Sequence, residues 1–357
     1  MNTAGTALRI TIFGESHGEL VGAVLDGLPA GMPLDIVRIQ QEIDMRRPAP
    51  LIGTARHESD IVEILTGHRN GKLTGTPLLI LFRNTDVRSA TYDAIQFVPR
   101  PGHADYTSFV KYGGFADSRG GGQFSGRMTA PLVAAGACAR QFLEKRGIRV
   151  AAFVRSIHTI RDDAEHTFDE VEKGRFSNEI RCLDPVLAEK MKGEILMARS
   201  NGDSVGGIVE CRASGMPAGL GDPFFDSVEG EISKMVFAIP AVRGIQFGSG
   251  FASTEMYGSE HNDQFTISEG KVVTLTNNAG GVNGGITNGM DIVFSVAFKP
   301  TSSIPKEQRS VDLTSMRETT IVVKGRHDPC IVPRAVIVVE AVCSLVLADL
   351  LLRGGLQ

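Results

Sequence analysis

The sequence predicts an α+β fold in which distant segments of one unit share a site. Apolar segments of strand length and segments of helical spacing both occur along the 357 residues. No Ser/Pro/Gly-rich linker and no charged run separates the two halves of the chain. This length suits two average domains or one large one, and the missing linker favours one.

Strands are expected where short apolar runs end at turn residues. The first, residues 8–13, runs into the turn at residues 14–18. The others are residues 21–25, 78–82, 150–154, 207–211, 292–298 and 320–323. Residues 100–127 lack periodicity and are rich in glycine, so we expect a loop there.

Two segments are predicted to be helices, one from its apolar spacing and one from the residues at its start. Residues 34–46 place Ile36, Ile39 and Ile43 on one side. Residues 129–146 have Thr129 in position to cap the helix and Pro131 in its first turn. We expect both helices to pack their apolar sides into the core.

The C-terminal segment, residues 335–352, approaches the length of a membrane span. Glu340 and Asp349 interrupt it, and Pro333 and Gly354 flank it as helix start and stop signals. We therefore expect a buried helix and no membrane partner.

A short internal repeat bears on the architecture. Residues 21–26 (VGAVLD) and residues 205–210 (VGGIVE) are each followed by Pro-Ala-Gly, at 29–31 and 217–219. The repeat is consistent with two similar α/β halves, and equally with chance.

The composition excludes several classes of protein. A net charge of −4, from 37 Lys+Arg against 41 Asp+Glu, argues against nucleic acid as a partner. The five cysteines are scattered and odd in number, and no CxxC occurs, so we expect buried thiols and no disulfide framework. The N-terminus lacks the pattern of a signal peptide. These features predict a cytoplasmic protein.

The 41 glycines exceed the usual share of ~7 %, and much of the surplus lies in a few loops. Residues 14–18 (GESHG) follow a strand and carry His17, which titrates near neutral pH. Residues 102–126 hold seven glycines between Arg100 and Arg127. Bare amides with fixed cations suit phosphate or carboxylate. The alternatives are a turn with an exposed histidine for the first segment and a Gly/Arg-rich RNA-binding tract for the second.

Further polar segments are less specific. Residues 324–330 carry Asp328, a possible proton acceptor, beside Arg326; the alternative is a solvated helix entry. Residues 277–289 suit a loop against a planar ligand, and residues 299–303 combine one ammonium with three hydroxyls. Walker A, GxGxxG and HExxH patterns are all missing, so neither a classical nucleotide fold nor a catalytic metal is expected.

Five motifs, in order along the chain, resemble the signatures of the chorismate synthase family. They are residues 13–18 (FGESHG), 100–105 (RPGHAD), 119–122 (RGGG), 299–303 (KPTSS) and 325–330 (GRHDPC). Any one alone is weak, but five in this order over nearly the whole chain are specific.

The resemblance implies a β-α-β sandwich acting as a single catalytic domain, residues 1–357, usually in a homotetramer. The implied reaction is the 1,4-anti elimination of phosphate from 5-enolpyruvylshikimate 3-phosphate, the last step of the shikimate pathway, which requires reduced FMN without net redox change. NADPH is a candidate reductant of the flavin. The alternative is a flavin-independent enzyme that binds another phosphorylated anion.

The resemblance also assigns roles to residues of this chain. His17 would be the general acid for the leaving phosphate, His103 would lie by the flavin, and Asp328 would act with the flavin in removing the ring proton. Substrate contacts would come from Ser16, Arg46, Arg56, Arg100, Arg127 and Arg326. FMN contacts would come from Gln123, Phe124, Ser125, Pro240, Ala241, Gly284, Lys299, Pro300, Thr301, Ser302, Ser303 and Arg326.

The chain departs from the family pattern in two places. Many members have Arg-Ala-Ser-Ala-Arg where this chain has residues 123–127 (QFSGR), so the first flavin contact becomes the uncharged Gln123. Residues 47–56 are less basic than the family loop, which affects the assignment of Arg56 and of any NADPH contact there.

Overall fold

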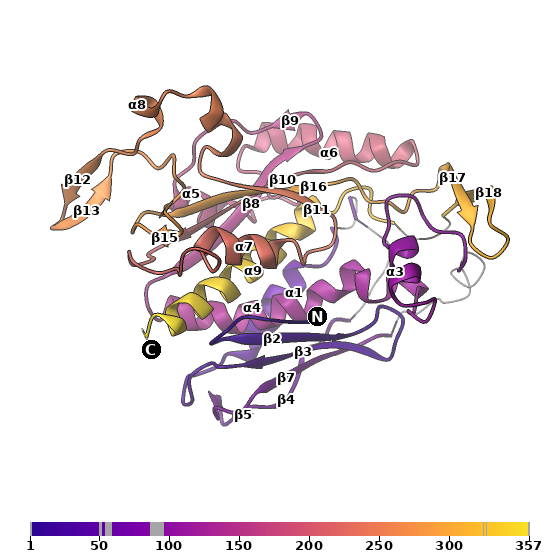
Figure 1. Ribbon diagram of the computed structural model, residues 1–357, viewed down its shortest axis with the longest axis horizontal. Coiled ribbons are helices and arrows are strands. Elements are labelled where there is room, and N and C mark those ends of the chain that lie inside the picture. The colour runs from indigo at the N-terminus through magenta and orange to yellow at the C-terminus, as the bar shows by residue number, and fades with distance from the viewer. Residues whose placement is uncertain are drawn as a thin grey trace.

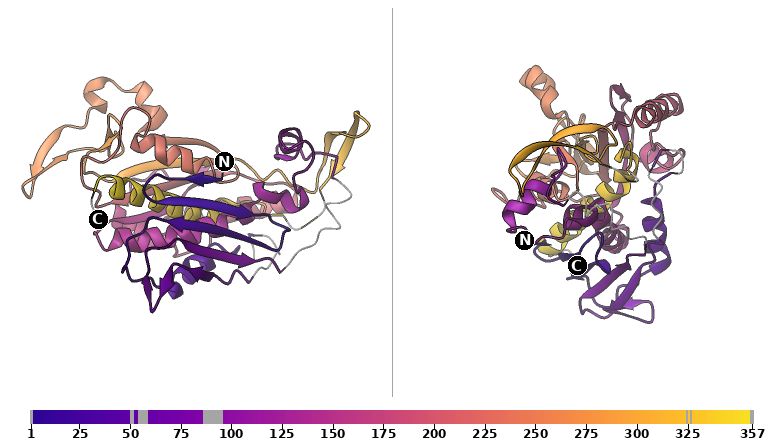
Figure 2. Two further views of the ribbon diagram at one scale, coloured as in Figure 1. Left: turned by 60° about the horizontal axis from the view of Figure 1, so that its bottom comes forward. Right: turned by 90° about the vertical axis from the view of Figure 1, so that its right-hand side faces the viewer.

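Two five-stranded antiparallel sheets enclose the long helices of the chain (Figure 1). The computed structural model describes residues 2–49, 52–53, 59–85, 96–323, 325 and 327–355. Figure 2 shows the same layers from two other sides. The arrangement is sheet, helices, sheet, which confirms the expected α+β sandwich.

The first sheet comes from the N-terminal part of the chain. Its strand order is β1 (Thr3–Ala4), β2 (Arg9–Gly14), β3 (Leu20–Asp26), β7 (Leu78–Arg83) and β4 (Glu63–Thr66). In β3, Val21, Ala23 and Leu25 are buried against the helices, and the period of two explains why this apolar run forms a strand. The predicted strands at 8–13, 21–25 and 78–82 are confirmed.

The second sheet comes from the middle of the chain. Its order is β11 (Val242–Phe247), β16 (Ile292–Phe298), β10 (Gly207–Ser214), β8 (Arg149–Ile157) and β9 (Ile160–Arg161). Burial alternates along the whole of β16. The repeated sequence at 21–26 and 205–210 falls on β3 and on the start of β10, which are the central strands of their sheets. Each copy of the repeat thus supplies the middle of one sheet.

Two helices fill the space between the sheets. α4 (Thr129–Glu144) packs on the first sheet and α9 (Val332–Arg353) on the second, and the two cross each other. Gly136 permits this crossing, because a Cβ there would lie 2.4 Å from the Cβ of Ala341. α9 is the one described helix long and apolar enough to cross a membrane, and 94% of that apolar window is buried. The expected buried C-terminal helix is confirmed.

The two carboxylates that interrupt α9 are both paired. Glu340 accepts hydrogen bonds from Arg140 Nη2 and from the Ala152 amide, each at 2.8 Å. Asp349 accepts three from the N-terminal segment, through the amides of Thr6, Ala7 and Leu8 at 3.1, 2.7 and 2.7 Å. Buried acids on a core helix therefore fasten the surrounding elements to it.

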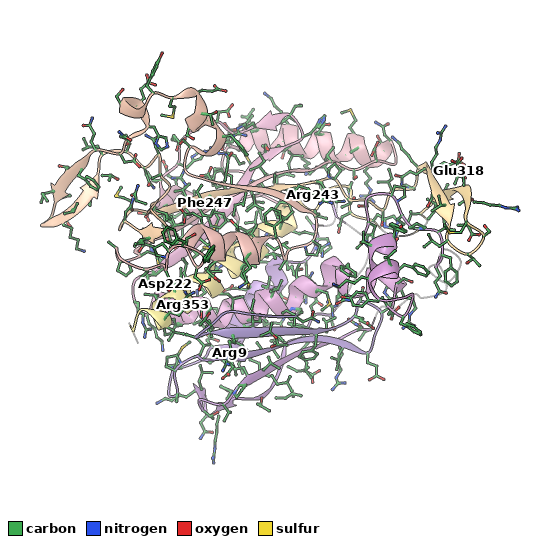
Figure 3. All side chains as sticks on the ribbon, in the orientation of Figure 1. Arg9, Asp222, Arg243, Phe247, Glu318 and Arg353 are labelled. Carbon is green, nitrogen blue, oxygen red and sulfur yellow. The ribbon has the colours of Figure 1, made fainter. Side chains whose placement is uncertain are left out.

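The remaining helices lie around this body, and Figure 3 shows side chains filling the space between the layers. α1 (Ile36–Met45) begins at Asp35, whose side chain accepts from the Arg38 amide. The others are α3 (Asp105–Lys111), α5 (Phe168–Gly174), α6 (Pro185–Ser200), α7 (Val228–Val236) and α8 (Gly258–His261). All five cysteines are buried and free, as expected.

Four small hairpins complete the fold. They pair β5 (His68–Arg69) with β6 (Lys72–Leu73), β12 (Phe265–Ser268) with β13 (Lys271–Thr274), β14 (Val282–Asn283) with β15 (Ile286–Thr287), and β17 (Glu307–Asp312) with β18 (Arg317–Val322). β12–β13 and β17–β18 project from opposite ends of the molecule (Figure 1).

Two local predictions are wrong. Residues 100–127 contain α3 and two short 3₁₀ turns, Arg119–Phe124 and Gly126–Met128, so the segment is not all loop. Thr129 does not cap α4: the capping position is Met128, and the Thr129 hydroxyl donates to the Gly126 carbonyl at 2.7 Å. The preceding 3₁₀ turn runs straight into α4, which leaves no extended residue for a cap of the usual kind.

Candidate active site

Most of the predicted site segments meet at one end of the molecule, beside α3. The Ser16 amide donates to the Gly122 carbonyl at 3.2 Å. This bond joins the 14–18 turn to residues 120–122, the glycine loop. Ser302 Oγ donates to the Gly102 carbonyl at 2.7 Å, and Thr301 Oγ1 to the Asp328 carbonyl at 2.8 Å. Segments far apart in the sequence thus form one site, as expected of a single unit.

His17 lies in the turn between β2 and β3, where Ser16 and His17 are both buried. Gly120 packs directly on its ring: a Cβ at this position would lie 1.9 Å from His17 Nδ1. Gly120, Gly121 and Gly122 all have positive φ, at 59°, 88° and 51°. Only glycine takes this run of conformations without strain, so the loop presents bare backbone to the histidine.

His103 approaches the same glycine loop at the next residue, Gly121. A Cβ on Gly121 would lie 3.2 Å from His103 Nε2. The opposite ring nitrogen, Nδ1, lies 2.6 Å from Asp105 Oδ1. An ionised Asp105 accepts the Nδ1 proton, which fixes the tautomer and leaves Nε2 directed at the glycine loop.

Arg100 holds Asp105 in its ionised form. The Arg100 Nε and Nη2 atoms donate to the two carboxylate oxygens at 2.7 and 2.8 Å. Burial raises the pKa of Asp105, but the hydrogen bonds from Arg100 and His103 outweigh it and hold that pKa well below its usual range. Arg100 Nη1 also donates to Ser303 Oγ at 3.2 Å, which ties this cluster to the 299–303 segment.

The 299–303 segment gathers a cation and hydroxyl groups. Lys299 Nζ donates to Ser302 Oγ at 2.5 Å. Burial, with the nearby charge of Arg243, lowers the pKa of Lys299. The Lys299 amide donates to the Ala241 carbonyl at 3.0 Å, which brings Pro240 and Ala241 to the same place. An ammonium with adjacent hydroxyls suits a phosphate group.

Two arginines converge on one buried carboxylate. Arg46 Nη2 lies 2.6 Å from Asp60 Oδ2, and Arg127 Nη1 pairs with Asp60 Oδ1. All three residues are buried. Burial lowers the pKa of Arg46 to about 10 against the opposing charge of Asp60. Two cations for one anion leave a net positive charge, which favours an anionic ligand.

Asp328 approaches the site from the segment before α9. Its Oδ2 lies 2.5 Å from Arg334 Nη1. The neighbouring His327 is half-buried, and burial lowers its pKa, so the imidazole is neutral at physiological pH. Arg56 and Arg326, two predicted contacts, lie outside the described residues.

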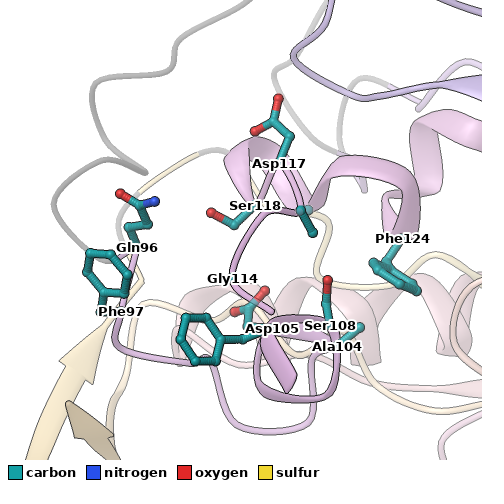
Figure 4. Close-up of a pocket in the computed structure, with 12 residues that line it drawn as sticks. Gln96, Phe97, Ala104, Asp105, Ser108, Gly114, Asp117, Ser118 and Phe124 are labelled. Atoms are coloured by element: carbon teal, nitrogen blue, oxygen red, sulfur yellow. The ribbon is translucent and has the colours of Figure 1, made fainter. Parts of the chain in front are cut away.

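A pocket opens between α3 and the glycine loop (Figure 4). Phe124 from the predicted flavin contacts lines it, together with Asp105 and Gly121. Gln123 is half-buried beside Phe124, and Ser125 Oγ accepts from the Arg127 amide at 3.2 Å. Within residues 123–125, Phe124 therefore borders the pocket and Ser125 contacts the backbone of Arg127.

Gly284 is the described site residue that stands apart. It lies in the turn between β14 and β15, at the opposite end of the molecule from α3 (Figure 1). Within one copy of the chain, the structure does not bring it to the other predicted contacts.

Sequence reasoning missed three residues that hold the site together: Asp60, Asn84 and Arg334. Asp60 pairs with two arginines, Asn84 follows strand β7, and Arg334 lies in the first turn of α9. None of them belongs to a glycine-rich or histidine-bearing segment. The available signal was weak, since each is a single polar residue next to an apolar element.

Comparison with known proteins shows the family of the chain. The family model for chorismate synthase matches residues 8–352. The chorismate synthase of Methanosarcina mazei is 49% identical over 355 residues, covering 99% of this chain and 97% of that protein. That of Pyrococcus abyssi is 49% identical over 348 residues, covering 98% and 97%. A crystal structure of chorismate synthase superposes with a TM-score of 0.77 at 29% identity, covering 98% of this chain and 93% of that chain. The chain belongs to the chorismate synthase family.

Proposed function

We propose that this chain eliminates phosphate from 5-enolpyruvylshikimate 3-phosphate to give chorismate. The reaction is a carbon–oxygen lyase step and the last of the shikimate pathway, which leads to aromatic amino acids. One observation carries the proposal: two histidines, His17 and His103, both approach the same bare glycine backbone, next to a net positive arginine cluster. Membership of the chorismate synthase family supports it, and the alternative of a flavin-independent enzyme finds no support in the comparisons.

The arginines suit the charge of this substrate, which carries a phosphate and two carboxylates. Arg46 and Arg127 share Asp60, and Arg100 is held by Asp105. We assign these three, with Ser16, Arg56 and Arg326, to substrate binding. Buried guanidinium groups recognise phosphate and carboxylate because their fork of N–H donors matches both.

The elimination breaks one C–O bond and one C–H bond. The C–O bond breaks with its electron pair going to the departing phosphate, and His17 supplies a proton to that phosphate as general acid. The C–H electrons form a new ring double bond, the existing ring double bond shifts to the carbon that loses phosphate, and Asp328 takes part in removing the ring proton. Substrate and products together show no net oxidation or reduction.

The described residues fit reduced FMN. A Cβ at Gly120 would lie 1.9 Å from His17 Nδ1, and one at Gly122 would lie 2.0 Å from the Asp117 carbonyl oxygen, so only glycine lets the loop pack this closely on its neighbours. Lys299, Thr301, Ser302 and Ser303 would hold the flavin phosphate, and His103 would lie at the ring. The bound reduced flavin supplies electron density that weakens the C–O bond. The remaining contacts would be Gln123, Phe124, Ser125, Pro240, Ala241, Pro300 and Arg326, and NADPH is the candidate reductant.

We also propose that residues 1–357 act as one catalytic domain in a cytoplasmic homotetramer. Large apolar side chains that are more than 70% exposed support association of copies: Phe224, Phe225, Phe251, Tyr257 and Phe265. In such an assembly Gly284 would reach flavin through a partner subunit. Sedimentation of the full chain tests this point, and a monomer at micromolar concentration would contradict it.

Titration of FMN fluorescence in the presence of substrate tests flavin binding. We expect saturable quenching, weakened about 10- to 100-fold by Lys299→Gln, because a charge-assisted hydrogen bond contributes roughly 1.5–3 kcal/mol. Lys306→Gln is the matched control, since Lys306 pairs with Asp203 at the surface, 2.6 Å away. Absence of any fluorescence change in the unmodified protein would favour the flavin-independent alternative.

A further inference from the structure

A continuous series of polar contacts runs beneath the site from the His17 turn to Asp328. It passes through Asn84, Arg127, Asp60, Arg46 and Arg334. We propose that Asn84 and Arg334 are positioning residues: Asn84 fixes the turn that carries His17, and Arg334 fixes the Asp328 carboxylate. The inference rests on the proposed function, because it assumes that His17 and Asp328 serve the elimination.

Asn84 joins the His17 turn to a substrate-binding arginine. Its Nδ2 donates to the carbonyls of Glu15 and Gly18, at 3.0 and 2.8 Å, on either side of Ser16 and His17. Its Oδ1 accepts from Arg127 Nε at 2.9 Å. One side chain thus uses both ends of its amide, one for the turn and one for the arginine.

The backbone of Asn84 adds a fourth contact. Its amide donates to the Glu19 carbonyl at 3.0 Å, so the residue is anchored where β7 ends beside the start of β3. Because the sheet fixes the backbone of Asn84, its side chain holds the 14–18 turn at a defined position. The rigid sheet, rather than the turn itself, therefore sets the place of His17.

The middle of the series is the buried pair of arginines on Asp60. Arg127 and Arg46 contact the two different oxygens of that carboxylate. A shift of Arg127 would therefore move Asp60 and, through it, Arg46. This arrangement links the end of the site at His17 to the end at Asp328 through three buried side chains.

Arg334 closes the series at its other end. Its Nη1 lies 2.5 Å from Asp328 Oδ2, and its Nε donates to the Arg46 carbonyl at 3.1 Å. The Asp328 main chain is held separately by Thr301 Oγ1. Main chain and carboxylate thus have independent anchors, and Arg334, on the rigid helix α9, is the anchor of the carboxylate.

The test at the first end uses Asn84→Asp. The variant keeps an oxygen for Arg127 but places a second oxygen against the carbonyls of Glu15 and Gly18. We expect kcat to fall about 10- to 100-fold with KM nearly unchanged, because a displacement near 1 Å at a reacting group has this effect. Hydrogen exchange of the Ser16 to Gly18 amides should also become faster.

A matched control is Gln141→Glu. Gln141 likewise donates from Nε2, to the Asp35 carbonyl at 3.0 Å, and accepts at Oε1 from the Asp35 amide at 2.8 Å, twelve residues along α4 from Thr129. It should leave kcat and the exchange of the turn unchanged. Wild-type kcat and wild-type exchange in Asn84→Asp would overturn the role of Asn84.

The test at the second end uses substrate carrying deuterium at the ring carbon that loses its proton. Arg334→Met should lower kcat and raise the primary isotope effect, because proton removal becomes slower than the other steps. Arg334→Lys should restore part of the lost kcat. It keeps the positive charge but cannot contact Asp328 and the Arg46 carbonyl through two separate nitrogen atoms. Asn84→Asp should not raise the isotope effect, since it disturbs the opposite end.

Arg353→Met controls for loss of an arginine from the same helix. Arg353 pairs with Asp222 at 2.5 Å at the far end of α9, as Figure 3 shows. It should change neither kcat nor the isotope effect. An isotope effect that stays at the wild-type value in a folded Arg334→Met protein would overturn the role of Arg334.

Failure of the proposed function is a separate result. If the unmodified protein forms no chorismate with reduced FMN, the proposed reaction fails. The exchange measurement on Asn84→Asp still decides whether Asn84 holds the turn, because it needs neither substrate nor flavin.

Discussion

At the residue scale, the site depends on ionised or neutral side chains fixed by their neighbours. His103 takes its tautomer from Asp105, and Asp105 keeps its charge through Arg100. His17 takes its place from the bare backbone of Gly120 and from Asn84, which holds the turn. These contacts fix the position of each imidazole, as the proposed proton transfers require.

Replacing either histidine should remove a proton-transfer group. His17→Ala and His103→Ala should each lower turnover by about 10² to 10⁴, the range for a lost general acid or base. The assay is chorismate formation with reduced FMN supplied. His158→Ala is the control, because that exposed histidine pairs with Glu194 at 2.9 Å. Turnover close to wild type in both site variants would refute the assigned roles.

Glycine-to-alanine substitutions should separate the effect of steric overlap at the site from the effect of backbone strain. Gly120→Ala and Gly147→Ala both force alanine into positive φ, at 59° and 74°, a strain of about 1–2 kcal/mol. Only Gly120 would meet another group, His17, whereas the Gly147 position is open. We expect Gly120→Ala to lose more unfolding free energy than Gly147→Ala, because its Cβ would also overlap the His17 ring, and we expect loss of activity only in Gly120→Ala. Equal activity in the two variants would contradict the packing of His17 on the loop.

The lowered pKa of Asp105 has a defined effect on acid stability. A carboxyl whose pKa is lower in the folded state stabilises the protein above its unfolded pKa of about 3.9 and loses this contribution as pH falls through the folded value. Asp105→Asn should therefore lose less unfolding free energy than wild type between about pH 6 and pH 3. Urea titrations at several pH values measure this. A larger loss of unfolding free energy in Asp105→Asn than in wild type over this pH range would refute the interpretation.

At the element scale, α9 combines an apolar surface with fixed acids. Glu340 is fully buried between Arg140, on α4, and Arg175, whose Nε lies 2.8 Å from its other oxygen. The same carboxylate accepts from the Ala152 amide on β8. A helix, a sheet and a loop are therefore joined at one buried charge, and its loss leaves two buried cations without that partner.

Glu340→Leu should lower the free energy of unfolding by about 3–5 kcal/mol, the effect of breaking a buried pair from one side. Glu172→Leu is the control, since Glu172 pairs with Arg149 at the surface, 2.5 Å away, where such pairs contribute about 0–1 kcal/mol. Urea unfolding of both variants measures the difference. An equal loss of unfolding free energy in the two variants would show that the buried Glu340 cluster stabilises the protein no more than a surface ion pair does.

At the scale of the whole molecule, local patterns predicted the strands and the core helix, because a period of two and an uninterrupted apolar run are set by near neighbours. The glycine loop and its histidines were also found, since bare backbone beside titratable groups is visible in the sequence. Helix α3 was missed because its seven residues lie among glycines that mask its period. Asp60, Asn84 and Arg334 were missed for another reason. Each of them also contacts a distant segment, which one sequence does not display: Arg127 lies 43 residues from Asn84 and 67 from Asp60, and Arg334 lies 288 residues from Arg46.

The central claim, that this chain converts 5-enolpyruvylshikimate 3-phosphate to chorismate with reduced FMN, is tested most directly by an anaerobic assay. Purified protein, substrate and photoreduced FMN are mixed without NADPH, and chorismate and inorganic phosphate are measured together. We predict equal amounts of both products, no net loss of reduced flavin, and no turnover when FMN is omitted. Phosphate release without chorismate, or the same rate without flavin, would contradict the claim.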